Sequence, residues 1–180
     1  ARILVRNALK YMDYGNTEIV VRINSIDENG FWSKDLDEII PLKPSMIMPT
    51  KVTNAEYVKK LSDYMTAIEQ KSGIPEGTVK LIPLIETAMG VENAYEIAVA
   101  DERVVAIFLG GEDLTADLCC VRTKEGDEIF YARCRMVNAA RAAGKDVYDT
   151  PFTDVNDDEG LIVDAKKAKS LGFTGKASIA

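Results

Sequence analysis

The stretch KLIPLIE at residues 80–86 and the stretch VVAIFLGGED at residues 104–113 decide how this chain folds. Short runs that are apolar at nearly every position suit strands that are buried on both faces of a parallel sheet. Each run ends in a carboxylate, Glu86 or Asp113. Because parallel sheets and barrels place their chemistry at the carboxyl ends of the strands, we expect these two acids to lie over one site.

Strand-like and helix-like stretches alternate along the rest of the chain, after a helical start at 2–11. Strands are predicted at 18–24, 46–49, 80–85, 104–109, 146–149 and 177–179. Helices are predicted between them at 33–40, 54–72, 90–100, 129–143 and 159–171. The second of these has apolar residues at steps of four, four and three, at Tyr57, Leu61, Met65 and Ile68, as one buried helix face requires.

Successive strand and helix units predict an α/β fold with a parallel sheet and right-handed crossovers. Six strands leave two architectures open, a doubly wound open sheet and an incomplete eightfold barrel, since a closed barrel usually needs about 200 residues or more. The 180 residues are 47% hydrophobic, which suffices for the core of a single domain spanning 1–180.

The composition restricts the partners. A net charge of −7 and a pI near 4.8 argue against nucleic acid, since phosphate contacts need clustered Lys and Arg. The sequence has neither a signal-peptide pattern nor an apolar run of about 18 residues that would span a membrane. We therefore expect a soluble cytoplasmic protein whose partners are proteins or small molecules.

The cysteines and the absence of histidine restrict the chemistry. Three cysteines, two of them adjacent at Cys119 and Cys120, form no disulfide framework and no metal-binding spacing, so we expect packing residues. The chain has no histidine, which removes the commonest general base and the usual zinc and copper ligands. A metal here must be held by oxygen, and one or two carboxylates with waters and substrate oxygens best describe a Mg²⁺ site.

Several polar side chains are predicted to meet at the carboxyl ends of the strands. They are Arg22, Asn24, Lys51, Glu86, Asp113 and Asp149. Glu86 and Asp113 are the metal-binding candidates, and Gly110 and Gly111 precede Asp113, where missing side chains let the backbone approach a ligand.

Arg22 lies between Val21 and Ile23 in the first strand, where a charge is costly to bury unless it is paired. Two interpretations remain open. Arg22 either faces solvent from an edge strand or binds a substrate anion, for which its planar guanidinium group is well suited.

Taken in order, VVRIN, PLIETAMGV, LGGEDLTADL, FYARCRMVNAARAAG and GFTGKASI resemble the citrate lyase β-subunit-like (HpcH/HpaI aldolase/citrate lyase) family across nearly the whole chain. The resemblance implies a TIM-type (β/α)8 barrel, which favours the barrel over the open sheet, with its first and last elements missing from this sequence. It implies Glu86 and Asp113 as Mg²⁺ ligands that also contact the substrate, and Arg22 as the substrate-binding catalytic arginine.

The resemblance also implies the reaction. We expect Mg²⁺-dependent cleavage of a citryl thioester on an acyl carrier protein to acetyl thioester and oxaloacetate. Alternatives are a malyl- or citramalyl-coenzyme A lyase of the same family, or a non-catalytic subunit of a lyase complex. A homo-oligomer, with further lyase subunits as possible partners, is expected from the family. Since the chain has no histidine, a water, or a carboxylate from a missing segment or from another subunit, is expected to accept the hydroxyl proton.

Overall fold

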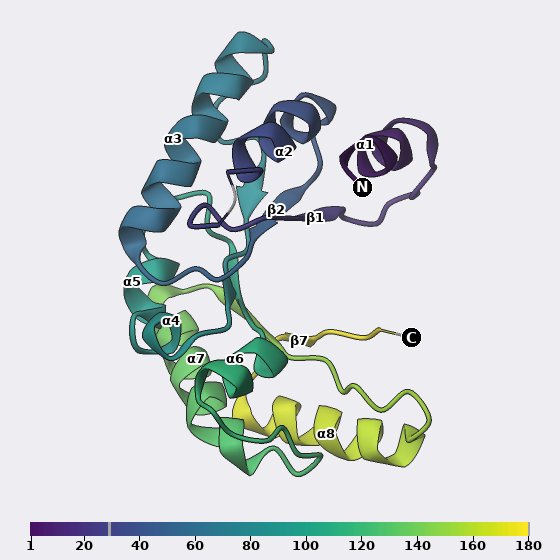
Figure 1. The fold of residues 1–180 in the computed structure, drawn as a ribbon, viewed down its shortest axis with the longest axis vertical. Coiled ribbons are helices and arrows are strands. Elements are labelled where there is room, and N and C mark those ends of the chain that lie inside the picture. The colour runs from purple at the N-terminus through teal and green to yellow at the C-terminus, as the bar shows by residue number, and fades with distance from the viewer. Residues whose placement is uncertain (29, 180) are drawn as a thin grey trace.

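The computed structural model describes residues 1–28 and 30–179 (Figure 1). The strands are β1 (Val20–Ile23), β2 (Met46–Pro49), β3 (Lys80–Leu81), β4 (Leu84–Ile85), β5 (Ala106–Leu109), β6 (Asp146–Asp149) and β7 (Gly175–Lys176). The helices are α1 (Arg2–Tyr11), α2 (Trp32–Ile39), α3 (Ala55–Lys71), α4 (Ala88–Glu92), α5 (Ala94–Ala98), α6 (Gly111–Asp117), α7 (Phe130–Ala143) and α8 (Asp158–Leu171), with 3-10 turns η1 (Ile40–Leu42) and η2 (Asp127–Ile129).

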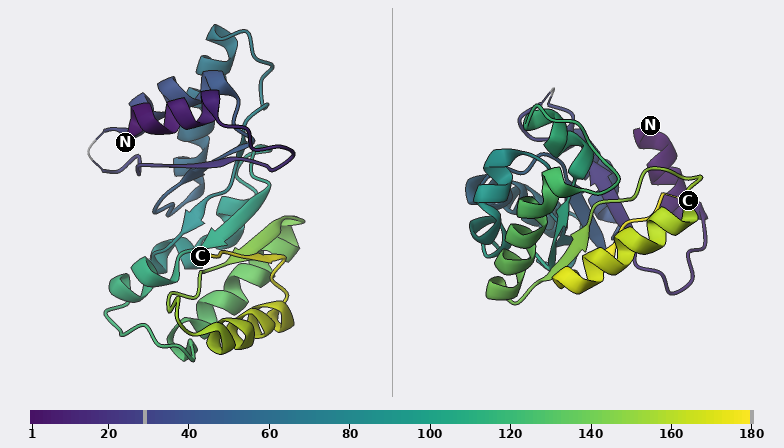
Figure 2. Two further views of the ribbon diagram at one scale, coloured as in Figure 1. Left: turned by 90° about the vertical axis from the view of Figure 1, so that its right-hand side faces the viewer. Right: turned by 90° about the horizontal axis from the view of Figure 1, so that it is seen from below.

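The strands form one curved, parallel wall that does not close on itself (Figures 1 and 2). Their order is β1-β2-β3 in one sheet and β4-β5-β6-β7 in the other. A parallel bridge between Leu81 and Val104 joins the two sheets, and the N–H of Val105 donates to the carbonyl of Leu81 at 3.1 Å. Helices α3, α5 and α7 cover the outer side of this wall. The predicted α/β fold, an incomplete TIM-type barrel, is confirmed.

The strand predicted at 80–85 is divided into β3 and β4 because Pro83 has no N–H to donate. The chain remains bonded on both sides of this break. The N–H of Ile82 donates to the carbonyl of Ile47 at 2.9 Å, and the N–H of Val52 donates to the carbonyl of Leu84 at 3.1 Å. The division is therefore a local interruption of one strand path in the wall.

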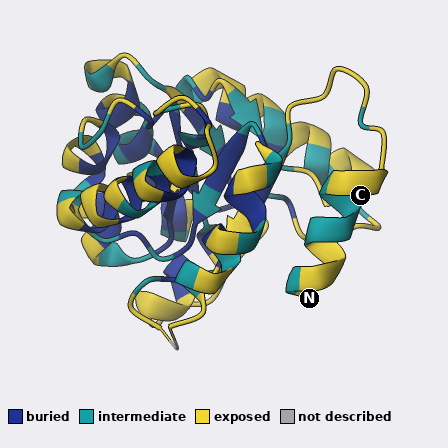
Figure 3. Cartoon of the chain, turned by 90° about the horizontal axis from the view of Figure 1, so that it is seen from above, coloured by how far each residue is buried: buried dark blue, intermediate teal, exposed yellow. Residues whose placement is uncertain are grey.

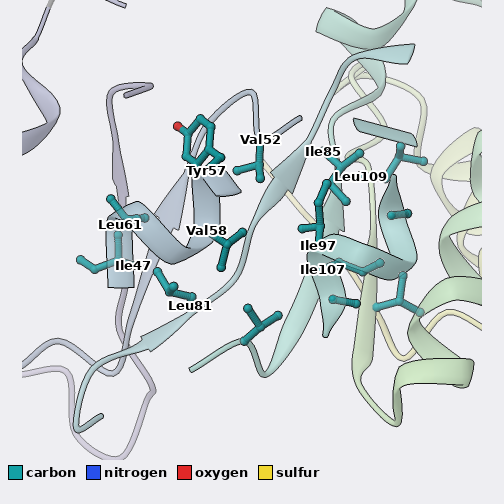
Figure 4. Packing of buried hydrophobic residues seen from close by; sticks show 14 of the residues in the cluster. Ile47, Val52, Tyr57, Val58, Leu61, Leu81, Ile85, Ile97, Ile107 and Leu109 are labelled. Atoms are coloured by element: carbon teal, nitrogen blue, oxygen red, sulfur yellow. The ribbon is translucent and has the colours of Figure 1, made fainter. Parts of the chain in front are cut away.

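The main core lies between the outer side of the wall and the helices (Figure 4). Ile47 and Leu81 of the wall pack with Leu61 of α3, and Ile107 packs in the same cluster with Ile97 of α5. The predicted face of α3 is buried, as its apolar spacing requires. The exposed residues lie mainly on the outward faces of the helices (Figure 3).

A smaller apolar cluster lines the inner, concave side of the wall. Met46, Ile82 and Ala106 are buried there, with Phe108 and Tyr148 packed against them. The rings of Phe108 and Tyr148 meet edge to face with their centroids 6.3 Å apart. Side chains of a strand alternate between its two faces, so the same row of positions that builds this cluster leads to the polar residues at the carboxyl ends.

Helix α6 was not predicted, and it changes the position of Asp113. The sequence places Asp113 at a strand end, whereas it lies in the first turn of α6, after β5 has ended at Leu109. The prediction that Cys119 and Cys120 are packing residues is wrong, because both are exposed. They end α6 instead: Cys119 has a left-handed φ of 57°, and the N–H of Cys120 donates to the carbonyl of Thr115.

The other predicted bounds lie within two residues of the observed ones, except that two further elements need correction. The helix predicted at 90–100 is divided into α4 and α5 at Asn93, whose side chain donates to the carbonyl of Thr53 at 2.8 Å. The strand predicted at 177–179 lies earlier, as β7, where Gly175 is paired with Tyr148. An added Cβ atom on Gly175 would lie 2.6 Å from the Tyr148 ring, so glycine permits this pairing.

In the part of the chain that the structure describes, none of the helices combines the length and the apolar character that crossing a bilayer requires.

Candidate metal and substrate site

Two adjoining cavities open at the carboxyl ends of the strands, with volumes of about 360 Å³ and 370 Å³. Three residues line both of them: Arg22, Glu86 and Asp113. These are the three residues that the sequence singles out, and the fold brings them together from β1, the end of β4 and the first turn of α6. The junction of the two cavities is therefore the candidate site.

Glu86 is buried and held in a fixed orientation. It follows β4 with only 4% of its surface exposed, and its Oε1 accepts a hydrogen bond of 2.9 Å from the backbone N–H of Lys51. Lys51 has a left-handed φ of 53°, which is uncommon for a residue with a side chain and is found more often at functional sites. Gly110 packs directly against Glu86, where an added Cβ atom would lie 2.8 Å from Oε2. The sequence interpretation of Gly110 is corrected accordingly: its missing side chain makes room for Glu86.

The carboxyl groups of Glu86 and Asp113 lie close enough to share a hydrogen bond. Burial, together with the negative charge of Asp113, raises the pKa of Glu86 to about 7, against the lowering effects of the Lys51 N–H and the Arg22 charge. Two carboxylates held this close repel each other when both are ionised. A cation between them removes that repulsion, so the pair favours a bound positive ion.

Arg22 projects from β1 toward the same cavities. Its neighbours Val21 and Ile23 are buried in the main core, so the alternation of the strand places Arg22 on the opposite, concave side, in register with Met48 of β2. The side chain is exposed and lines both cavities. β1 is also the end strand of its sheet. Arg22 therefore lies on an edge strand, as the first interpretation expected, and its guanidinium group faces the site, as the second one expected.

The other predicted residues at the strand ends do not all reach this site. Lys51 lines the smaller cavity, and its Nζ pairs with Glu28 at 2.6 Å. Asn24 lines it too and donates from Nδ2 to Asp35 at 2.6 Å. The placement of Asp149 among these residues is wrong. It is fully buried, and its two carboxylate oxygens accept hydrogen bonds from the side chains of Arg133 and Lys176.

The donor set fits a magnesium ion. Among residues 1–28 and 30–179, no group of three or more Asp, Glu, Cys or His side chains is arranged to hold a metal. The site offers two carboxylates and an open cavity, and Mg²⁺ usually keeps several waters while binding one or two protein carboxylates and substrate oxygens. The chain contains no histidine, so zinc-type ligation by imidazole is absent from this donor set.

A larger cavity, of about 480 Å³, lies at the opposite, amino ends of the strands, where Arg103 and Lys80 are found. The guanidinium group of Arg103 already has hydrogen-bond partners within the protein. It donates to both carboxylate oxygens of Glu69, to Ser62 and to Thr66. This buried group of residues connects α3 to the loop before β5, and its charges are satisfied within the protein, so it serves the fold.

Sequence reasoning missed Thr150, which lines the larger of the two junction cavities directly after β6. It also missed the buried charged residues beneath it, which come from α7, α8 and β7. A threonine after a strand carries no distinctive signal. What Thr150 contacts depends on α6, which is 39 positions away and was not predicted.

The chain is similar to known proteins along its whole length. A match to the HpcH/HpaI aldolase/citrate lyase family extends over residues 1–180. The chain is 41% identical to the citrate lyase subunit beta of Leuconostoc mesenteroides subsp. cremoris, covering 99% of this chain and 59% of that protein. It is 33% identical to the mitochondrial citramalyl-CoA lyase of Rattus norvegicus, covering 99% of this chain and 55% of that protein. The chain thus spans less than two thirds of the length of these relatives.

A solved structure is similar as well. The citrate lyase beta subunit from Mycobacterium tuberculosis, complexed with oxaloacetate and magnesium, matches with a TM-score of 0.79 at 30% identity, covering 97% of this chain and 73% of that chain.

Proposed function

This chain belongs to the HpcH/HpaI aldolase/citrate lyase family, and we propose on that basis that it is a Mg²⁺-dependent carbon–carbon lyase acting on a hydroxyacyl thioester, with residues 1–180 acting as one domain. The observation that carries the proposal is the convergence of Arg22, Glu86 and Asp113 at the junction of two cavities. The relatives named above, a citrate lyase subunit and a citramalyl-CoA lyase, support the reaction class.

Glu86 and Asp113 are the residues that would hold the ion. When bound, Mg²⁺ supplies a Lewis acid that polarises substrate oxygens and lowers the pKa of a coordinated hydroxyl group. Glu86 is prepared for this role by the Lys51 N–H, which fixes one of its oxygens, and by Gly110, which leaves room for its carboxylate. Asp113 stands on the cavity side of α6, where it is exposed to an incoming ligand.

Arg22 faces the two carboxylates across the junction and adds a fixed positive charge. In the proposed role it binds an anionic group of the substrate, either a carboxylate or the thioester oxygen on which negative charge grows as the bond breaks. Its planar guanidinium group can donate two parallel hydrogen bonds to one carboxylate, which orients the substrate as well as holding it.

The proposed reaction is a retro-Claisen cleavage. The hydroxyl group of the substrate loses its proton to a base, and its oxygen becomes the new carbonyl of the keto acid. The bond between the hydroxyl-bearing carbon and the carbon next to the thioester breaks, and its electron pair passes to the thioester as an enolate. Protonation at carbon then gives the acyl thioester. Because the chain has no histidine, a water or a carboxylate is proposed as the base.

For the substrate we propose a citryl group on an acyl carrier protein, which is cleaved to acetyl thioester and oxaloacetate. The 41% identity to a citrate lyase beta subunit favours it. Citramalyl-coenzyme A is the second candidate, favoured by the 33% identity to citramalyl-CoA lyase, and malyl-coenzyme A is a third of the same class. Assembly as a homo-oligomer, or with other lyase subunits, is part of the proposal.

The substrate is tested by incubating the purified protein with the citryl, citramalyl and malyl thioesters and measuring oxaloacetate, pyruvate and glyoxylate. We expect oxaloacetate from the citryl thioester, and its formation should stop in excess chelator and resume when Mg²⁺ is added. Pyruvate or glyoxylate formation instead would move the assignment to one of the coenzyme A lyases. Stable capture of a carrier protein without any product and without Mg²⁺ binding would favour a non-catalytic subunit.

The ligand assignment is tested with Asp113→Ala. Because Asp113 is exposed on α6, its loss should leave the thermal unfolding midpoint close to that of the wild type while abolishing Mg²⁺-dependent cleavage. Asp154→Ala is the control, since Asp154 is a half-exposed aspartate that pairs with Lys124 outside both cavities. Full activity of Asp113→Ala would refute the metal assignment.

A further inference from the structure

Thr150 joins the end of β6 to the beginning of α6. It is fully buried, and its Oγ1 accepts a hydrogen bond of 2.9 Å from the backbone N–H of Gly111, the first residue of α6. Glycine permits this approach, because a Cβ atom added to Gly111 would lie 2.9 Å from the Thr150 Oγ1 atom and 3.1 Å from its Cγ2 atom. A contact between residues 39 positions apart therefore fixes where α6 starts.

The first turn of α6 depends on such a contact. The first N–H groups of a helix have no partner within the helix and are usually satisfied by a capping side chain. The N-cap residue of α6 is Gly110, which has no side chain to offer, and the helix is only seven residues long. The hydroxyl group of Thr150 takes the place of that cap. Asp113 lies in the same turn, two residues after Gly111.

Thr150 is in turn held by a group of charged side chains, of which Lys176 is 13% exposed and the other three are buried. Lys176 Nζ donates to the carbonyl of Thr150 at 2.7 Å and to Asp149 Oδ2 at 2.8 Å, and it lies 2.6 Å from Asp164 Oδ2. Arg133 completes the group, since its guanidinium donates to both oxygens of Asp149 and to Asp164 Oδ1. Two cations and two carboxylates balance each other, and breaking any of these pairs would leave a buried charge uncompensated.

We propose that Thr150 is a positioning residue for Asp113, and that the buried group of Arg133, Asp149, Asp164 and Lys176 keeps Thr150 in place. The inference rests on the proposed function, in which Asp113 binds Mg²⁺ beside Glu86. Groups that orient a metal-binding side chain typically change metal affinity by about 10- to 100-fold when they are removed. The same scale is expected here, because α6 carries Asp113 to the junction where Glu86 is already fixed.

The test compares Thr150→Val with Thr150→Ser. Valine keeps the shape but cannot accept the Gly111 hydrogen bond, whereas serine keeps the hydroxyl group. We expect Thr150→Val to bind Mg²⁺ at least about tenfold more weakly in the presence of oxaloacetate, measured by calorimetry. Thr150→Ser should bind close to the wild-type affinity. Thr150→Ala is a second variant without the hydroxyl group, and it is free of any strain from the added methyl group of valine.

Hydrogen exchange on the metal-free proteins supplies a readout that does not depend on activity. Loss of the Thr150 acceptor should make the amides at 111–114 exchange about two- to tenfold faster, which is the fold-change that one hydrogen bond typically confers. Thr174→Val is the matched control. Its hydroxyl group also bridges to a strand, contacting Val147 at the other end of β6, and removing it should leave Mg²⁺ affinity unchanged.

Unchanged Mg²⁺ affinity and unchanged exchange in both Thr150→Val and Thr150→Ala would overturn the inference, and so would an equal loss of affinity in Thr174→Val. A wild-type protein that binds no Mg²⁺ would instead refute the proposed function. In that case exchange at 111–114 in the metal-free variants still decides whether Thr150 holds the start of α6.

Discussion

Replacing Gly110 by alanine should displace Glu86 without altering any charge at the site. A Cβ atom on Gly110 would lie 2.7 Å from the Glu86 Cβ and 2.8 Å from its Oε2. Comfortable contacts between carbon atoms are about 3.5–4.0 Å, so one of the two residues must move by roughly 1 Å. The backbone itself accepts alanine, because Gly110 has a φ of −101°. The whole effect of the substitution should therefore come from this close approach.

For Gly110→Ala we expect a modest loss of folding stability and a separate, larger loss of Mg²⁺ affinity. Forcing an extra carbon into a packed position destabilises a protein by about 1–3 kcal/mol, and for a chain of this size each kcal/mol lowers the unfolding midpoint by about 2–4 °C. Glu86 is buried and is held on its other side by the Lys51 N–H, so its carboxylate must leave that hydrogen bond to make room. We expect the affinity for Mg²⁺ to fall by at least about tenfold, as for other changes that misplace a metal-binding group.

The assay is Mg²⁺ titration by calorimetry, with thermal unfolding of the same samples. Gly144→Ala is the matched control: Gly144 has a φ of +67° and open space around its Cα atom. Alanine there is destabilising by about 1–2 kcal/mol through backbone strain alone and lies away from the site. If Gly110→Ala binds Mg²⁺ as the wild type does, or if both variants lose affinity equally, the reasoning about Glu86 is wrong.

Three further predictions concern charge. Arg22→Lys keeps the positive charge but loses the planar group, so kcat for thioester cleavage should fall by at least about tenfold while Mg²⁺ binding persists; unchanged kinetics would make Arg22 a structural residue. Asp149→Asn leaves Arg133 and Lys176 with one carboxylate too few and should be destabilising by about 3–5 kcal/mol in urea unfolding; a loss no larger than that of an exposed residue would contradict the role given to this carboxylate. Burial opposes ionisation of Glu69, but hydrogen bonds from Arg103 and from two backbone N–H groups outweigh it and hold the pKa of Glu69 below its usual value. The resulting stability is present above the unfolded-state pKa, near 4.5, and is lost as the pH falls below it. Glu69→Gln should therefore flatten the fall in urea-measured stability below about pH 5, and a curve as steep as that of the wild type would refute this assignment.

The fold was predictable where local pattern and global packing agree. Apolar runs such as 104–109 were recognisable because the strands that they form are buried in the wall. The apolar residues Tyr57, Leu61 and Met65 recur once per helical turn because one face of α3 is buried. Helix α6 was missed because its sequence offers no apolar stripe or capping side chain. Its start depends on the contact with Thr150.

By itself the sequence determined which reactive residue types the site can contain and the order in which the strands contribute them. An acid at the end of each of two apolar runs, an arginine in the first strand and no histidine restrict the chemistry to oxygen ligands and a guanidinium group, whatever the details of the fold. Parallel strands with short connections then bring their carboxyl ends to one edge, which is why Glu86 and Asp113 could be paired without coordinates.

Only the tertiary structure decided which of the charged residues at the strand ends meet. Asp149 and Glu86 occupy similar positions in the sequence, since each stands at the carboxyl end of a predicted strand. Their environments differ because buried Asp149 is reached by two cationic side chains from distant helices and strands, whereas Glu86 is reached by one backbone N–H and a second carboxylate. Partners of this kind are fixed by packing over tens of residues, and no local pattern in the sequence encodes them.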